Sequence, residues 1–281
     1  MHFHFPFTTV QVLWTLTFAG HLVLLVVLLG RERIRRFPWF TTSIVLMTLR
    51  LLASRLLFGR LPRLTLSEIF IGMADIAAVV SLLVLVELAR HTFGKVTRRA
   101  WIVAAVVLLA IGGGVLATWG NWPSWKTVAF NTLLARLEML QLFSLKMGLL
   151  VDVLTILLGL LVILFGRRYG AGWRSHGQQI MIGLSTASLG QLGVQAIWER
   201  IVKTTVPHSM ADYERVMGLR DKLFNGDSVV YLLVVVWWIV CLWIDEPGKA
   251  DLAAVAVPVG DGGPEREMSA AVEPPGPPSQ S

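Results

Sequence analysis

Long, uncharged apolar runs constrain this chain more than any other feature. A hydrocarbon core about 30 Å thick requires a helix of about 20 residues, and every backbone group inside lipid must be hydrogen-bonded within the protein. The runs are continuous rather than alternating, which favours helices over barrel strands. The sequence predicts an all-α, polytopic membrane helix bundle with seven transmembrane helices, at about 9–30, 38–59, 68–90, 100–119, 147–166, 178–198 and 228–245.

Composition agrees with a lipid environment. Charged residues make up only 15% of the chain and hydrophobic residues 55%, whereas a soluble domain carries roughly 25% charged residues. The net charge is +7, but the basic residues are scattered between the apolar runs rather than clustered on one domain. The expected partner is therefore the lipid bilayer, and nucleic acid is excluded.

The distribution of basic residues predicts the orientation. The loops 31–37, 91–99 and 167–177 contain only one acidic residue, Glu32, and they hold Arg31, Arg33, Arg35, Arg36, Lys95, Arg98, Arg99, Arg167, Arg168 and Arg174. Because basic loops stay in the cytoplasm, the N-terminus is expected outside and the C-terminus inside. Residues 1–8 lack Lys and Arg, so no cleavable signal peptide is expected. The predicted location is the cell inner (plasma) membrane, with multiple passes.

Two domains of different character are expected. Residues 1–246 form the transmembrane domain, and 247–281, rich in Pro, Gly and Ala, are predicted to be a disordered cytoplasmic tail. Within the first domain, 126–146 is expected to form an amphipathic helix at the outer surface, running into the fifth span. The pattern of residues 207–226 predicts a helix that is capped by Ser209 and ends at Asn225-Gly226. This helix is expected to lie on the membrane surface or to form a lid over a pocket.

Polar residues inside the spans are the candidates for function. Such groups are costly in lipid and tend to be functional, and the candidates are Arg50, Asp75, Asp152, Gln191, Gln195 and Tyr231. A helix rise of about 1.5 Å per residue places Arg50 roughly 14 Å and Asp75 roughly 10 Å below the outer surface. We expect these residues to share one layer and to line an outer-facing ligand pocket. The alternatives are a structural ion pair of Arg50 with an aspartate, and a proton or ion path.

Other polar residues receive structural interpretations. His21 is isolated on an apolar helix and is expected to be packed and hydrogen-bonded. Glu87 and Arg90 are three residues apart, so they are expected to pair on one helix face. The single cysteine, Cys241, cannot form an internal disulfide.

Several chemistries are disfavoured by the sequence. Residues 228–244 contain no Lys for a retinal Schiff base, and no H-E-x-x-H motif, Gly-rich phosphate loop or G-x-S-x-G elbow occurs. His2 and His4 alone do not make a metal site. We therefore expect no cofactor, no metal and no catalytic residue, and an enzyme is less favoured than a binding protein.

In span number and orientation the chain resembles the seven-helix membrane sensor regions of bacterial signalling proteins, and more distantly the outside-N, inside-C receptors. No motif carries the likeness, so it assigns no residue a role. The resemblance implies a sensor or ligand-binding membrane protein for a small polar ligand. The tail is shorter than the roughly 50 residues of a domain, so no output domain and a separate cytoplasmic signalling protein are expected. The alternatives are a transporter or channel-like carrier, and a structural subunit of a membrane complex.

Overall fold

A computed structural model describes residues 8–93, 97–119, 133–165, 175–205 and 209–245. Within this part the fold is all-α, and Met1–Glu246 group into one compact unit. Its elements are α1 (Thr9–Gly30), the short 3-10 helix η1 (Arg33–Arg35), α2 (Pro38–Leu57), α3 (Arg63–Phe93), α4 (Arg98–Thr118), α5 (Leu133–Phe165), α6 (His176–Thr204) and α7 (Met210–Trp243). The predicted tail, 247–281, lies outside the described residues.

Local sequence explains where several helices begin. Thr8 and Gln11 form a capping box at the start of α1, in which each side chain accepts a hydrogen bond from the other's backbone N–H. Pro38 stands in the first turn of α2, where its missing N–H costs nothing. The Ser209 hydroxyl accepts from the Asp212 N–H at 3.1 Å and caps α7, as the sequence predicted.

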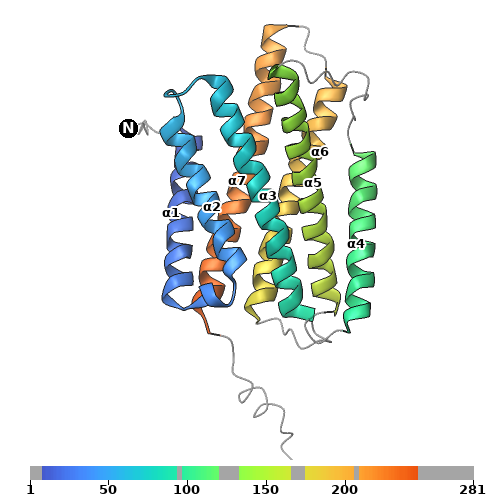
Figure 1. Ribbon diagram of the computed structural model, residues 1–281. Coiled ribbons are helices and arrows are strands. Elements are labelled where there is room, and N and C mark those ends of the chain that lie inside the picture. The colour runs from blue at the N-terminus through green and yellow to red at the C-terminus, as the bar shows by residue number, and fades with distance from the viewer. Residues whose placement is uncertain (1–7, 94–96, 120–132, 166–174, 206–208, 246–281) are drawn as a thin grey trace, which may run out of the picture. The chain divides into compact units, whose positions relative to one another are not determined.

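Six of the helices close a ring, and the seventh lies outside it. In the order of their contacts the ring runs α1, α2, α3, α5, α6, α7 and back to α1. α4 packs against α5 on the periphery and lies at the right-hand edge of the helices in Figure 1. The Lys146 ammonium on α5 donates to the Trp119 carbonyl and ties down the end of α4.

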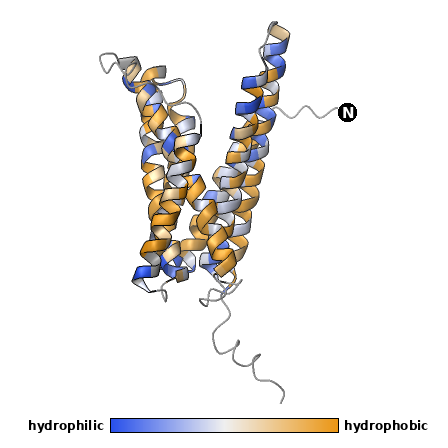
Figure 2. Ribbon diagram, turned by 90° about the vertical axis from the view of Figure 1, so that its right-hand side faces the viewer, coloured by the Kyte–Doolittle hydropathy of each residue, from blue (hydrophilic) through white to orange (hydrophobic). Residues whose placement is uncertain are grey.

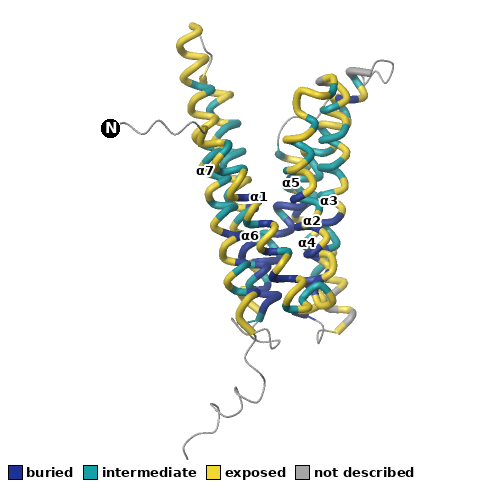
Figure 3. The backbone as a smooth tube through the Cα atoms, turned by 90° about the vertical axis from the view of Figure 1, so that its left-hand side faces the viewer, coloured by how far each residue is buried: buried dark blue, intermediate teal, exposed yellow. Residues whose placement is uncertain are grey.

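The two ends of the ring are packed differently. We call the end where α1 ends at Gly30 and α2 begins at Pro38 the closed end, and the opposite end the open end. The buried apolar core gathers toward the closed end and includes Leu24, Leu28, Phe40, Ile44, Val84, Leu88, Leu158, Val162, Met181, Val235 and Trp238. Figure 3 shows the buried backbone concentrated there, while the helices at the open end are more exposed.

Small residues let α6 approach its neighbours closely. A Cβ added at Gly183 would lie 2.7 Å from Trp238 Cε2 on α7, and one at Gly159 on α5 would lie 2.9 Å from the Ser185 Cβ. Both distances are shorter than real side-chain contacts. α6 therefore packs backbone to side chain against α5 and α7.

The chain is a multi-pass membrane protein. Among the residues that the structure describes, six helices are long and apolar enough to cross a bilayer, and α4 adds a shorter apolar stretch, Ile102–Thr118. Figure 2 shows apolar residues along most of the helix lengths. Large apolar side chains such as Val26, Val103, Leu164 and Leu233 are exposed on the unit, which is what a lipid-facing surface requires.

The prediction of a separate helix lying on the membrane at 207–226 is wrong. The described residues of this segment from Met210 onward belong to α7, which continues through Asn225-Gly226 as one helix of 34 residues. Each of these two residues costs at most about 1 kcal/mol inside a helix, and packing of α7 against α1 and α6 offsets that cost. The Arg220 guanidinium lies 5.8 Å from the Trp198 ring of α6 and holds the extension beside it.

For the segment 126–146, the prediction that its helix runs into the fifth span is confirmed over the described residues. Residues from Leu133 onward form one uninterrupted helix with the fifth span, whereas 126–132 lie outside the described residues. At about 1.5 Å per residue, the 33 residues of α5 are longer than a bilayer core about 30 Å thick requires. The polar first turns of α5 and α7 can therefore extend beyond the hydrocarbon.

Candidate functional site

Polar side chains gather in the half of the ring nearer the open end, around two adjoining cavities. The α2–α7 cavity, about 560 Å³, is lined by His21, Arg50, Asp227 and Tyr231. The α2–α5 cavity, about 440 Å³, is lined by Arg50, Asp152, Gln191 and Gln195, together with residues of α3. Both volumes lie in the range of small-molecule sites.

A narrower central space lies between the two cavities. Its volume is about 190 Å³, and it shares Asp227 and Tyr231 with the first cavity and Asp152 and Gln191 with the second. Met47 on α2 lines all three. The polar residues of six helices thus surround three adjoining spaces that share lining residues, which we call the connected cavities.

Arg50 lines both cavities from the middle of α2, seven residues before the helix ends at Leu57. Its side chain forms no ion pair or hydrogen bond with any residue in the described part of the chain. The structural interpretation, in which Arg50 pairs with Asp75 or Asp152, therefore finds no contact to support it. A guanidinium at this depth offers five donors to an anion.

Asp152 is buried on α5 and has one hydrogen-bond partner. Its Oδ1 accepts from the Ser188 hydroxyl of α6 at 2.8 Å. One turn closer to the closed end, the Ser185 hydroxyl donates to the Thr155 carbonyl at 3.1 Å. Ser188 and Ser185 therefore fix α6 against α5, and the second oxygen of Asp152 accepts no hydrogen bond from the described residues.

The two glutamines of α6 stand one turn apart and line the α2–α5 cavity. Neither side chain makes a hydrogen bond with other described residues. An amide carries two donors and one acceptor oxygen, so Gln191 and Gln195 can bind either end of a polar molecule.

Tyr231 links three helices at the lower boundary of the α2–α7 cavity. Its hydroxyl lies 2.8 Å from His21 Nε2 on α1 and donates to the Met47 sulfur on α2 at 3.1 Å. The expectation that His21 is packed and hydrogen-bonded is confirmed.

Asp75 is the one predicted site residue that stands apart. It does not line the two cavities or the space between them, although its neighbour Ala74 lines the α2–α5 cavity. One residue corresponds to about 100° of rotation around a helix, which turns Asp75 away. The position of Asp75 along its span predicts its depth in the membrane. Only the packing of α3 determines which side of the helix faces the cavities.

Asp227 lines both the α2–α7 cavity and the central space and was not predicted. The sequence predicts an outer loop at this position, because Asn225-Gly226 is typical of the end of a helix. Its spacing of four residues from Tyr231 is the signal that could have found it, since residues four apart share a helix face.

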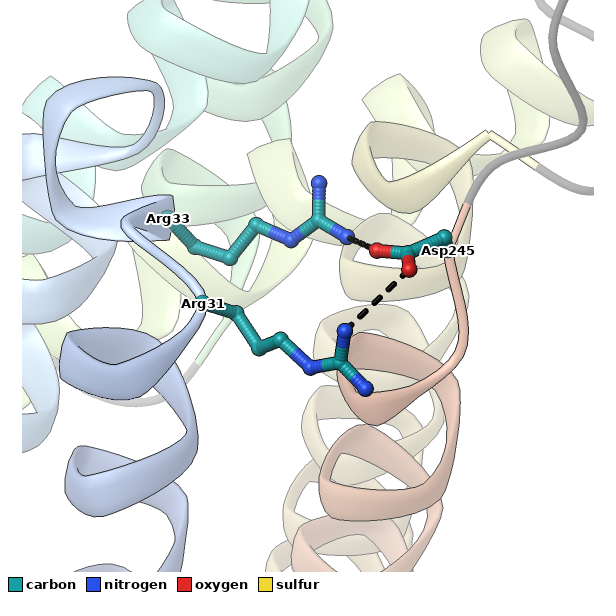
Figure 4. A network of polar contacts seen from close by, with 3 residues as sticks. All are labelled: Arg31, Arg33 and Asp245. Carbon is teal, nitrogen blue, oxygen red and sulfur yellow. Dashed lines mark hydrogen bonds and ion pairs between the residues drawn. The ribbon is translucent and has the colours of Figure 1, made fainter.

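Polar contacts at the closed end are structural. Glu87 on α3 accepts from the backbone N–H groups of Trp39 and Phe40 at 3.3 and 3.0 Å, and so caps α2 from another helix. The expected pairing with Arg90 is not seen among the ion pairs of the described residues. Figure 4 shows Asp245, just after α7, accepting from Arg31 at 3.1 Å and Arg33 at 2.8 Å.

The chemistry available in the cavities is recognition by charge and hydrogen bonding. Within the described ranges, no group of three or more His, Cys, Asp or Glu is placed to hold a metal ion. Comparison of the chain with protein-family models, curated proteins and solved structures finds no match.

Proposed function

We propose that this chain is a seven-span membrane sensor or ligand-binding protein, with a small polar ligand held in the connected cavities near the open end. The observation that supports this most is the convergence of Arg50, Asp152, Gln191 and Gln195 on one cavity, with their hydrogen-bonding capacity largely unused. Polar groups are costly inside a membrane protein unless they are paired. A ligand that pairs them supplies the missing contacts.

The proposed orientation places the open end outside the cell. The connections at the closed end include 31–37, with four arginines, and the loops 91–99 and 167–177 of the same basic character. Basic loops remain in the cytoplasm, so the closed end faces inward and the membrane is the cell inner (plasma) membrane. α4, with 21 residues, spans about 31 Å at 1.5 Å per residue and is counted as the seventh span.

The packed closed end favours binding over transport. Beneath the cavities, Leu24, Phe40, Leu88, Met181 and Trp238 are each no more than 1% exposed. A polar solute has no hydrated route between such side chains, so the cavities end inside the protein. A carrier would need a second arrangement in which this core separates.

α7 is the element through which ligand binding would reach the cytoplasmic side. It carries Asp227 and Tyr231 at the cavities, and Asp245, just beyond its end, contacts Arg31 and Arg33 (Figure 4). A ligand shifts such an element only if it binds two positions of the helix with different affinity. A separate cytoplasmic protein would then detect the change at the closed end.

Thermal stabilisation of the purified full chain tests the proposal. The probes are inorganic phosphate, acetate, small amines, amino acids and sugars, each added to the chain in detergent. We expect at least one class to raise the melting temperature, and Arg50→Ala to abolish that increase. Arg55→Ala is the matched control, because Arg55 lies on the same helix but does not line the two cavities.

Two results would contradict the proposal. If no probe stabilises the chain, the cavities are not a ligand site for these classes. If stabilisation survives Arg50→Ala, Arg50 is not part of the site. Flux of the stabilising probe into liposomes containing the protein would replace the sensor by a carrier.

A further inference from the structure

The charges that face the connected cavities are of both signs. One is the guanidinium of Arg50 on α2, and two are the carboxylates of Asp152 on α5 and Asp227 on α7. No ion pair joins Arg50 to either aspartate within the part of the chain that the structure describes. The site therefore presents a cation and two anions that are not neutralised by one another.

The two carboxylates lie near each other across the central space. Both line it, so two like charges, which repel each other, face the same narrow space. Asp152 uses one oxygen for Ser188, while Asp227 makes no hydrogen bond to other described residues. A cationic group between the two carboxylates would relieve this repulsion. It would displace no hydrogen bond of Asp227 to the described residues.

Gly190 makes the position of Asp227 possible. A Cβ at this residue of α6 would lie 3.1 Å from Asp227 Oδ1, tighter than most real contacts. The carboxylate thus lies over bare backbone, facing the central space rather than a neighbouring side chain. Its placement toward α6 follows from the absence of a side chain at one residue.

A ligand with a single charge would leave part of this site unsatisfied. An anion would pair with Arg50 and leave both carboxylates without a partner, and a cation would do the reverse. Charges that are removed from water without a partner are strongly disfavoured. A molecule with a carboxylate at one end and an ammonium at the other satisfies both groups in one orientation.

We propose that the ligand is a small zwitterion of the amino-acid class, with its carboxylate on Arg50 and its ammonium between Asp152 and Asp227. Gln191 lines the α2–α5 cavity and the central space and can hydrogen-bond to either end. The assignment rests on the proposed function, because it names the ligand class of the same cavities.

Blocking one end of the ligand at a time tests the charge assignment. The standard L-amino acids are compared with their C-terminal amides, which keep only the ammonium, and their N-acetyl forms, which keep only the carboxylate. Binding to the full chain in detergent is measured by isothermal titration and by thermal shift. For the best amino acid, each blocked form should bind at least about tenfold more weakly, the effect of losing one charge-assisted contact.

Variants assign each end to its residue. Asp227→Asn should weaken the amino acid and its amide by about tenfold and leave the N-acetyl form unchanged. Asp221→Asn, at an exposed position of the same helix, should change nothing. Gly190→Ala keeps the charge but displaces the carboxylate, and it should weaken the same two ligands if Asp227→Asn does not fold.

Each failure has a distinct meaning. An N-acetyl form that binds as tightly as its parent identifies an anion site, and an equally tight amide identifies a cation site. Either result, or binding of other polar probes but no amino acid, overturns the zwitterion while leaving a ligand site in place. Absence of binding by every probe class overturns the proposed function itself.

Discussion

At the scale of single residues, the chain uses long-range contacts where local sequence offers none. Phe37 at the N-cap position of α2 has no side-chain acceptor, and the start of this helix makes no side-chain cap of its own. Glu87 supplies the acceptor from α3 instead, with a carboxylate that is only 7% exposed. The negative charge also interacts favourably with the positive end of the helix dipole.

Removal of this cap should destabilise the closed end. Glu87→Ala leaves two backbone donors of α2 unsatisfied inside the protein, at a cost of about 1–3 kcal/mol. For a protein of this size, that corresponds to a fall of roughly 2–4 °C in melting temperature for each kcal/mol. Arg90→Ala, at an exposed position of the same helix, is the control and should melt as the unchanged chain does. Equal melting of all three proteins would exclude the capping role.

The sequence predicts which types of residue form the site better than it predicts which side chains face the cavities. The free-energy cost of polar side chains inside a membrane points to Arg50, Asp152 and the two glutamines of α6. The structure brings these residues to one cavity. The same cost also points to Asp75, which lies about 100° around α3 from the lining residue Ala74. Rotation of a helix is fixed by its packing, and the apolar faces of membrane helices are too uniform to reveal it.

At the scale of elements, the approach of α6 to its neighbours depends on two glycines. Trp238 packs over Gly183, and Ser185 packs over Gly159 on α5. Backbone at these points is the surface against which the larger side chain rests. Small residues permit such close packing, but only the packed helices determine which glycine meets which partner.

A methyl group at Gly183 should force the helices apart. Gly183→Ala places a Cβ against the Trp238 indole, and overpacking of this kind costs about 1–3 kcal/mol. The expected result is a lower melting temperature of the purified chain. Gly193→Ala is the matched control, because it lies on the same helix with nothing within 4 Å of the added Cβ. A Gly183→Ala chain as stable as the Gly193→Ala chain would show that α6 and α7 do not pack as described.

The length of α7 was the largest difference between sequence and structure at this scale. Asn225-Gly226 is a strong local stop signal, yet the helix continues for 17 more residues, through Trp243. Contacts with α1 and α6 outweigh the local preference. Continuity of the helix brings Asp227 into the cavities, so one wrong boundary also hid one site residue.

At the scale of the whole molecule, the ring is closed by apolar packing at one end and lined by polar groups nearer the other. All six ring helices contribute to the apolar core, and all six contribute residues to the central space or the adjoining cavities. Composition and run length predicted the membrane bundle, because the bilayer imposes both. The order of helices around the ring and the peripheral place of α4 arise from packing, which run length does not encode.

Ligand binding in the cavities requires that water reach them from outside the cell, and cysteine labelling tests this directly. Replacement of the single cysteine by Cys241→Ala gives a background for Gln191→Cys, which lines the cavities, and Leu189→Cys, which is 57% exposed on the same helix but does not line them. A charged, membrane-impermeant thiol reagent applied to intact cells should label the first variant and leave the second unlabelled in lipid. No labelling at 191, or equal labelling at 189, would contradict a solvated, outward-facing site.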